Sequence, residues 1–133
     1  MQRDTKFNVL IVDNDDRILC KFQQLLEDTG FNTTATWSGH EALGLLRSGV
    51  FDVLLVDDYL PDLHSHNFLE RVHRLPIQPS IVVMHNEPAK PDDLQCYETL
   101  GVAQLVDKRN PLGVCEAVSF CHAEQPLVTR PVN

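Results

Sequence analysis

The chain has 133 residues, of which 43% are apolar and 23% are charged, and its formal net charge is −8. This length fits one globular domain whose core needs no disulfide or metal support, and the acidic charge argues against direct binding to nucleic acid or to an anionic membrane. The four cysteines form no C-x-x-C pair and no apolar run could span a bilayer, so we expect a cytoplasmic protein with reduced thiols and no membrane partner.

Strand-like and helix-like segments alternate along the chain. The strand candidates are rich in apolar and β-branched residues, and the helix candidates carry apolar residues at helical spacing. In chain order we expect a strand over 7–12, a helix over 17–28, a strand over 31–37, a helix from Ser38 to about Gly49, a strand over 50–56, a helix over 67–75, a strand over 81–84, a helix over 92–100, a short strand over 105–106 and a helix over 112–122.

Local signals support these boundaries. Ser38 and Glu41 have the spacing of a capping box at a helix start. Gly30 and Gly101 are typical of helix ends, and Pro111 is typical of a first helical turn. We therefore expect one domain over 1–124, followed by a tail or linker over 125–133.

Five units of strand followed by helix, with short connections, predict an α/β fold. The expected architecture is a doubly wound, open parallel sheet with helices on both faces. In such sheets ligands bind beyond the carboxyl ends of the strands, where the strand order reverses. That rule predicts which residues can share a site.

Polar residues follow four of the predicted strands. Asp13 and Asn14 end the first strand, Asp57 ends the third, the fourth ends at Met84 and His85, and Lys108 ends the fifth. Two carboxylates and an amide around a small pocket suit a hard cation with oxygen ligands, above all Mg²⁺. A lysine beside an aspartate and a metal is also the charge environment that phosphoryl transfer requires.

Three motifs then resemble a known family. VLIVDND (9–15), VLLVDDYLPD (53–62) and VDK (106–108), in this order and each at a strand end, are similar to the receiver domain of two-component response regulators. The resemblance extends from about residue 6 to residue 122. It implies the flavodoxin-like (βα)5 receiver fold with strand order 2-1-3-4-5. It also implies a signal-transduction role in a phosphorelay, with a phosphoryl group passing from a histidine kinase or phosphotransfer protein to an aspartate.

The resemblance assigns the phosphoryl chemistry to particular residues. Asp57 matches the phosphoacceptor because Pro61 follows four residues later, and Lys108 matches the lysine that pairs with it. Asp58 is then expected to be a loop residue that faces elsewhere.

The resemblance also implies a Mg²⁺ site. Its ligands would be Asp13, Asn14, Asp57 and the backbone carbonyl of Tyr59. The family has an acidic residue where Asn14 stands, so this ligand brings an amide oxygen without charge.

Several switch positions differ from the family. A Thr or Ser is expected at the end of the fourth strand, where we place Met84, and the usually small next residue is His85. Leu105 stands where a switch aromatic is expected, and Arg109 replaces a proline after Lys108. Met84 has no donor, so His85 is a candidate to donate a hydrogen bond to the phosphoryl group instead.

Two functions remain open from the sequence. The first is a phosphoacceptor receiver, acting alone or joined to an output domain beyond Asn133. The resemblance to receivers also implies that a homodimer can form through the face made by 92–100, the fifth strand and 112–122. The second is a phosphorylation-independent pseudo-receiver that acts as a protein-interaction module. We expect no enzyme activity beyond self-phosphorylation and self-dephosphorylation, because a phosphatase of the haloacid dehalogenase type needs an Asp where Tyr59 stands.

Overall fold

The computed structural model describes residues 7–87 and 90–124, and strands and helices alternate strictly through them. The expected tail over 125–133 lies outside the described residues. The elements are β1 (Asn8–Val12), α1 (Asp16–Asp28), β2 (Asn32–Thr36), α2 (Gly39–Ser48), β3 (Val53–Asp57), α3 (Ser65–His73), β4 (Ser80–His85), α4 (Pro91–Thr99), β5 (Val102–Asp107) and α5 (Pro111–Glu124).

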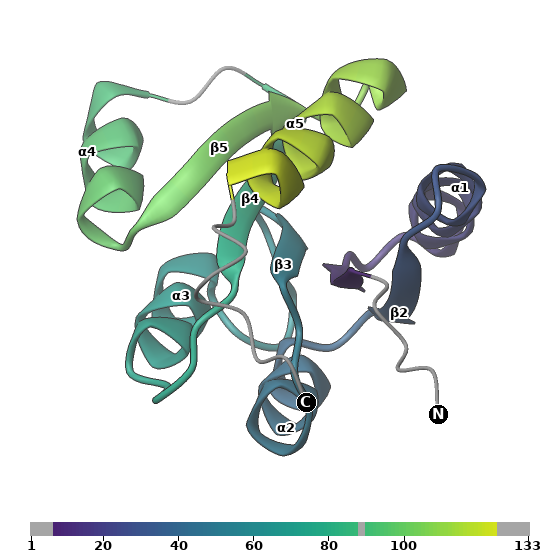
Figure 1. The fold of residues 1–133 in the computed structure, drawn as a ribbon. Helices are drawn as coiled ribbons and strands as arrows, with labels where there is room; N and C mark the ends of the chain where they lie inside the picture. Colours follow the sequence, from purple (N-terminus) through teal and green to yellow (C-terminus); the bar gives the residue numbers. More distant parts are fainter. Residues whose placement is uncertain (1–6, 88–89, 125–133) are drawn as a thin grey trace.

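The five strands form one parallel sheet in the order β2-β1-β3-β4-β5. Helices cover both of its faces, with α1 and α5 on one side and α2, α3 and α4 on the other (Figure 1). The predicted fold class and strand order are therefore confirmed. The order reverses between β1 and β3, so their carboxyl ends flank the position where such sheets bind ligands.

Alternate residues of the central strands feed two separate cores. On β1, Val9 and Ile11 pack with α1 and α5, whereas Leu10 and Val12 pack with α2 and α3. Every residue of β3 is buried, as expected for a central strand of a parallel sheet that is covered on both faces. These two cores hold the strand ends rigidly.

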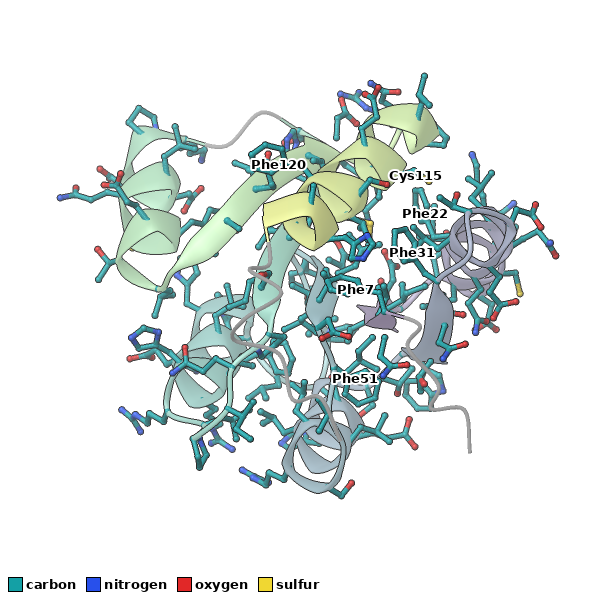
Figure 2. All side chains as sticks on the ribbon, viewed as in Figure 1. Phe7, Phe22, Phe31, Phe51, Cys115 and Phe120 are labelled. Atoms are coloured by element: carbon teal, nitrogen blue, oxygen red, sulfur yellow. The ribbon has the colours of Figure 1, made fainter. Side chains whose placement is uncertain are left out.

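The core under α1 and α5 is rich in aromatic side chains. Phe7, Phe22 and Phe31 gather between α1, α5 and the sheet (Figure 2), and the ring centroids of Phe7 and Phe31 lie 5.8 Å apart. Phe120 points away from this core and is 52% exposed.

All five strands differ from their predicted ranges, β1 by one residue at its start and β2 by one residue at each end, and the differences at β3, β4 and β5 matter most for the site. β3 begins at Val53 rather than Val50, whose side chain is exposed in the connection from α2. β5 is longer than predicted, because an edge strand tolerates polar residues such as Gln104. β4 continues one residue beyond Met84 to His85, which pairs with Asp107 of β5. This last difference changes which residue stands at the strand tip.

Side chains cap the starts of α1 and α2, whereas α3 and α4 have no side-chain cap hydrogen bond. The Ser38 hydroxyl accepts a hydrogen bond from the Glu41 amide at 3.1 Å, as the predicted capping box requires. The Glu41 carboxylate, however, accepts from the Thr36 hydroxyl instead of from the Ser38 amide. The cap of α1 is Asp15, whose side chain accepts from the Arg17 amide.

Candidate functional site: a charged cavity at the carboxyl edge of the sheet

Three charged side chains meet at the carboxyl ends of β1, β3 and β5. The Lys108 ammonium lies 2.8 Å from Oδ2 of Asp13 and 2.9 Å from Oδ1 of Asp57. Asp13 is fully buried, and Asp57 and Lys108 are 5% and 7% exposed. We call these residues the charged triad. They are separated widely in the sequence, and the parallel topology brings them together.

Backbone hydrogen bonds fix two members of the triad, Asp13 and Lys108. The Asp13 amide donates to the Thr36 carbonyl at the end of β2, and the Asp13 carboxylate accepts from the Asp15 amide. The Lys108 amide donates to the carbonyl of His85 at the tip of β4. Asp13 is thus not the cap of α1, because Asp15 takes that role.

The triad forms part of the wall of a cavity of about 310 Å³. Its side chains come from the ends of β1, β3, β4 and β5 and from the loops that follow them. The cavity is lined by Asp13, Asn14, Asp15, Ile18, Asp57, Asp58, Tyr59, Asn86 and Lys108.

Burial and crowding perturb the carboxyl groups of the cavity. Burial raises the pKa of Asp13, and the Asp57 charge adds to this, against hydrogen bonds from Lys108 and the Asp15 amide. Burial also raises the pKa of Asp57, where Lys108 opposes the shift and the adjacent Asp58 carboxylate reinforces it. Both carboxylates are therefore short of positive charge.

Lys108 is the cation that holds them. Burial alone would lower its pKa, but its hydrogen bonds to Asp13 and Asp57 outweigh burial and raise it. The ammonium therefore stays charged at neutral pH. The single positive charge of Lys108 faces two buried carboxylates. A second cation bound beside them would therefore be electrostatically favourable.

Asp58 contradicts the sequence prediction that it faces elsewhere. It lines the cavity, and its carboxylate is close enough to Asp57 to raise the pKa of that group. The alternation of a strand would turn the residue after Asp57 to the opposite face. The strand ends at Asp57, however, and the chain bends there, so the alternation rule no longer applies.

The other predicted metal ligands also border the cavity. Asn14 and Tyr59 both line it, and the Tyr59 side chain is 64% exposed. Asp15 lines it as well, but its carboxylate already accepts the Arg17 amide at the start of α1.

The predicted switch residues lie outside the cavity lining. Met84 is the penultimate residue of β4 and pairs with Asp57 of β3, but its side chain is fully buried in the core under α1 and α5, together with Ile11 and Val82. His85 occupies the tip and is half-buried, and its Nδ1 is buried without a hydrogen-bond partner among the described residues. Leu105 pairs with Val83 and packs against the opposite core. We call Met84, His85 and Leu105 the relay positions.

Arg109 forms a local ion pair at the position where the family has proline. Its backbone amide and guanidinium donate to the Asp107 carboxylate at 2.7–2.9 Å. These hydrogen bonds lower the pKa of Asp107 to about 2.

A further residue of the loop after β3 was not singled out from the sequence. The Asp62 carboxylate accepts hydrogen bonds from the backbone amides of Gly39 and His40 and from the Ser38 hydroxyl. Although burial opposes the shift, these hydrogen bonds hold the pKa of Asp62 well below its usual range. The loop between Asp57 and α3 is thereby tied to the start of α2.

A larger hollow of about 530 Å³ lies along α3 and α4, lined by His66, Glu70, Asp92, Gln95, Cys96, Thr99 and Leu100. Within the described ranges, no three His, Cys, Asp or Glu side chains are arranged to hold a metal ion, here or elsewhere. In the part of the chain that the structure describes, the buried charged residues all line the cavity beside Asp57, which we take as the candidate functional site.

Comparison with known proteins identifies the family. The sequence model of the response regulator receiver domain matches residues 9–118. The chain therefore belongs to the response regulator receiver domain family, which acts in two-component signalling.

Curated relatives agree with this assignment. The chain is 32% identical over 79 residues to the transcriptional regulatory protein ZraR of Salmonella typhimurium, covering 59% of this chain and 18% of that protein. It is 26% identical over 101 residues to the response regulator SaeR of Staphylococcus aureus, covering 76% and 43%. The chain thus spans less than half the length of these relatives.

The fold is shared with solved receiver domains. A CheY-like receiver domain protein from Methanospirillum hungatei superposes with a TM-score of 0.81 at 24% identity, covering 91% of this chain and all of that one. The chemotaxis response regulator CheY4 of Vibrio cholerae gives 0.80 at 23% identity, covering 88% and 99%. Receiver domains are generally signalling modules rather than enzymes. Among the described residues, no helix combines the length and apolar character needed to cross a bilayer.

Proposed function

We propose that this chain is a phosphoacceptor receiver whose Asp57 takes a phosphoryl group from a phosphohistidine of a histidine kinase or phosphotransfer protein. The observation that supports this most directly is the contact of one buried ammonium with two buried carboxylates, Asp13 and Asp57. Burying such charges is costly unless they are paired and used. A fold held together only by its cores would not need them at a strand end.

The residues present fit a Mg²⁺ ion. Mg²⁺ takes oxygen ligands, keeps several waters and is usually bound by only one or two carboxylates together with phosphate oxygens. Asp13 and Asp57 offer carboxylates, Asn14 an amide oxygen and Tyr59 a backbone carbonyl at the same cavity. When bound, the ion would neutralise negative charge on the transferring phosphoryl group. Burial raises the pKa values of Asp13 and Asp57, so a bound cation would stabilise their ionised forms.

The side chains of the cavity divide the chemistry between them. A carboxylate oxygen of Asp57 forms a bond to phosphorus as the phosphorus–nitrogen bond of the phosphohistidine breaks, and the imidazole leaves with the electron pair. Lys108, already 2.9 Å from Asp57, neutralises the phosphoryl oxygens that arrive beside it. Asp13 holds Lys108 in place from the opposite side.

Phosphorylation can be measured directly by intact mass. Acetyl phosphate and Mg²⁺ should add one phosphoryl group to the wild-type chain. The adduct should be absent in Asp57→Asn and present in Asp58→Asn, the matched control at the neighbouring carboxylate of the same cavity. Equal labelling of the two variants would show that Asp57 is not the acceptor.

The alternative is a pseudo-receiver that binds partners without phosphate. The neutral Asn14 and the hydroxyl-free Met84 and Leu105 favour it, because each removes a group that the family uses. No adduct at millimolar Mg²⁺ in the wild-type chain, together with an intact fold, would support this alternative.

The partner surface can also be proposed. The last two helices carry exposed apolar side chains, Leu94 on α4 and Leu112 and Phe120 on α5. We expect a homodimer or an output domain to contact this face. The longer regulators that the chain resembles leave room for such a domain in the full protein. Light scattering across a concentration series, with and without beryllofluoride, tests the dimer.

A further inference from the structure

One residue of the segment after β4 lines the cavity beside Asp57. Among the lining residues that the structure describes, Asn86 is the one contributed by the segment after β4, and it is exposed. It directly follows His85, the last residue of the strand. Asn86 therefore stands across the cavity from the loop that carries Asn14 and beside the tip that carries Asp57.

A phosphoryl group on Asp57 would enter a cavity that is poor in hydrogen-bond donors. The phosphoryl group brings strong acceptor oxygens and about two negative charges, and the lining already holds four carboxylates. The side-chain donors available on the described lining are the Lys108 ammonium, the amides of Asn14 and Asn86, and the Tyr59 hydroxyl. Asn14 lies in the acidic loop after β1, on the side where the cation is expected.

The other residues near the tip of β4 are poorly placed to supply the missing donor. Met84 is in the core and has no donor. His85 lies opposite Asp107 in the β4–β5 pairing, away from the cavity lining. Among the described residues that line the cavity, His85 does not appear. The sequence-based hypothesis that His85 donates to the phosphoryl group thus has less structural support than the same role for its neighbour.

We propose that the side-chain amide of Asn86 donates a hydrogen bond to a phosphoryl oxygen on Asp57, in place of the hydroxyl that the family carries at the tip of β4. The inference rests on the proposed phosphoacceptor function and adds a positioning residue to it. The amide has two N–H donors and can reach the phosphoryl group from an exposed loop without burying an unpaired polar atom.

Beryllofluoride is a suitable probe because its fluorines accept the hydrogen bonds that phosphoryl oxygens would. Its affinity for the folded chain is measured at fixed Mg²⁺ by changes in the amide spectrum. Asn86→Ala should weaken binding about tenfold, the factor expected for one lost hydrogen bond to a charged group. Asn86→Asp, which keeps the shape but adds negative charge, should weaken it further. Asn67→Ala, an exposed asparagine of α3 outside the cavity lining, is the matched control and should bind like wild type.

A second readout is the lifetime of the phosphoryl group after acetyl phosphate is removed, which should shorten in Asn86→Ala. If wild type binds beryllofluoride through Asp57 and Asn86→Ala binds equally well, the role of Asn86 is refuted while the phosphoacceptor function stands. A larger loss in His85→Ala than in Asn86→Ala would also refute it. If wild type itself binds no beryllofluoride, the phosphoacceptor function fails, and the inference fails with it.

Discussion

The charged triad and the relay positions lie at the same edge of one sheet but differ in kind. The triad consists of three residues that the sequence resemblance led us to expect at the site, is almost fully buried, and is tied together by two short ion pairs. At the relay positions apolar or bulky residues stand where the family carries a hydroxyl, a small residue and an aromatic. The contrast suggests that groups needed to receive a phosphoryl group are retained, while groups that would report it are changed.

The two regions also differ in how they contribute to stability. Met84 and Leu105 stabilise the fold by packing in the two cores. The triad is a site of competing charges, where burial opposes ionisation and only Lys108 compensates. Substitutions at the relay positions should therefore act through packing, and substitutions in the triad through electrostatics. Four predictions are ordered from the largest expected effect to the smallest.

Replacing Lys108 by Met should produce the largest loss. The substitution leaves Asp13 and Asp57 buried without a counter-ion, which should lower the free energy of unfolding by about 4 kcal/mol at neutral pH. Urea denaturation measures the loss. Millimolar Mg²⁺ should recover part of it, since a cation can take the place of the ammonium. A loss below about 1 kcal/mol would show that the triad is not under electrostatic stress.

Replacing Met84 by Thr tests whether residue 84 can contact the phosphoryl group, as the sequence-based interpretation implies, or acts only as a core residue. If Met84 were a tip residue, the new hydroxyl would restore a phosphoryl contact and lengthen the lifetime of the adduct. Because Met84 is a core residue, the variant should instead lose about 3 kcal/mol through a cavity and a buried hydroxyl, without a longer lifetime. Thermal unfolding and the decay of the intact-mass adduct together decide between the two.

Asp62→Ala should have a moderate effect. It removes the side chain that accepts hydrogen bonds from the start of α2, so stability should fall by about 1 kcal/mol. The pKa of Asp62 is lowered in the fold, so its contribution is present above its ordinary value near 4 and disappears as pH falls through the lower, folded value. Wild type and variant should therefore converge in strong acid. A constant difference at every pH would show that the hydrogen bonds do not depend on the charge of Asp62.

Mg²⁺ should give the smallest change, and one that depends on pH. The pKa values of Asp13 and Asp57 are raised in the fold, so their protonated forms add stability at acid pH, and this is lost as pH rises through the raised values. Mg²⁺ at its own dissociation constant should return about 0.4 kcal/mol at neutral pH. Protons should displace it in acid. Thermal shifts at several pH values test this, with Asp57→Asn as the variant expected to respond less.

Much of this edge could be predicted from the sequence, because strand ends and parallel topology are sufficient to bring distant residues together. Asp13, Asp57 and Lys108 each end or follow an apolar strand, and their convergence follows from the strand order. The sequence could not predict the strand ends to within one residue. β4 runs one residue past its last apolar side chain, so the tip is His85 rather than Met84.

The geometry of the loops could not be predicted from the sequence either. Asp58 turns into the cavity because the chain bends just after β3, and Asp62 reaches back to α2 across 23 residues. Neither contact has a local sequence pattern. Asn86 was missed for the same reason, since the loop after β4 gives no periodicity from which its direction could be inferred.

The most direct test of the contrast between the two regions is the amide spectrum of the labelled chain with beryllofluoride and Mg²⁺. We expect saturable shifts at Asp13, Asp57 and Lys108 that vanish in Asp57→Asn, with much smaller changes at Met84 and Leu105. An unchanged spectrum at millimolar Mg²⁺ would contradict a retained phosphoryl-receiving site. Shifts of equal size at the relay positions would contradict the view that these positions no longer report phosphorylation.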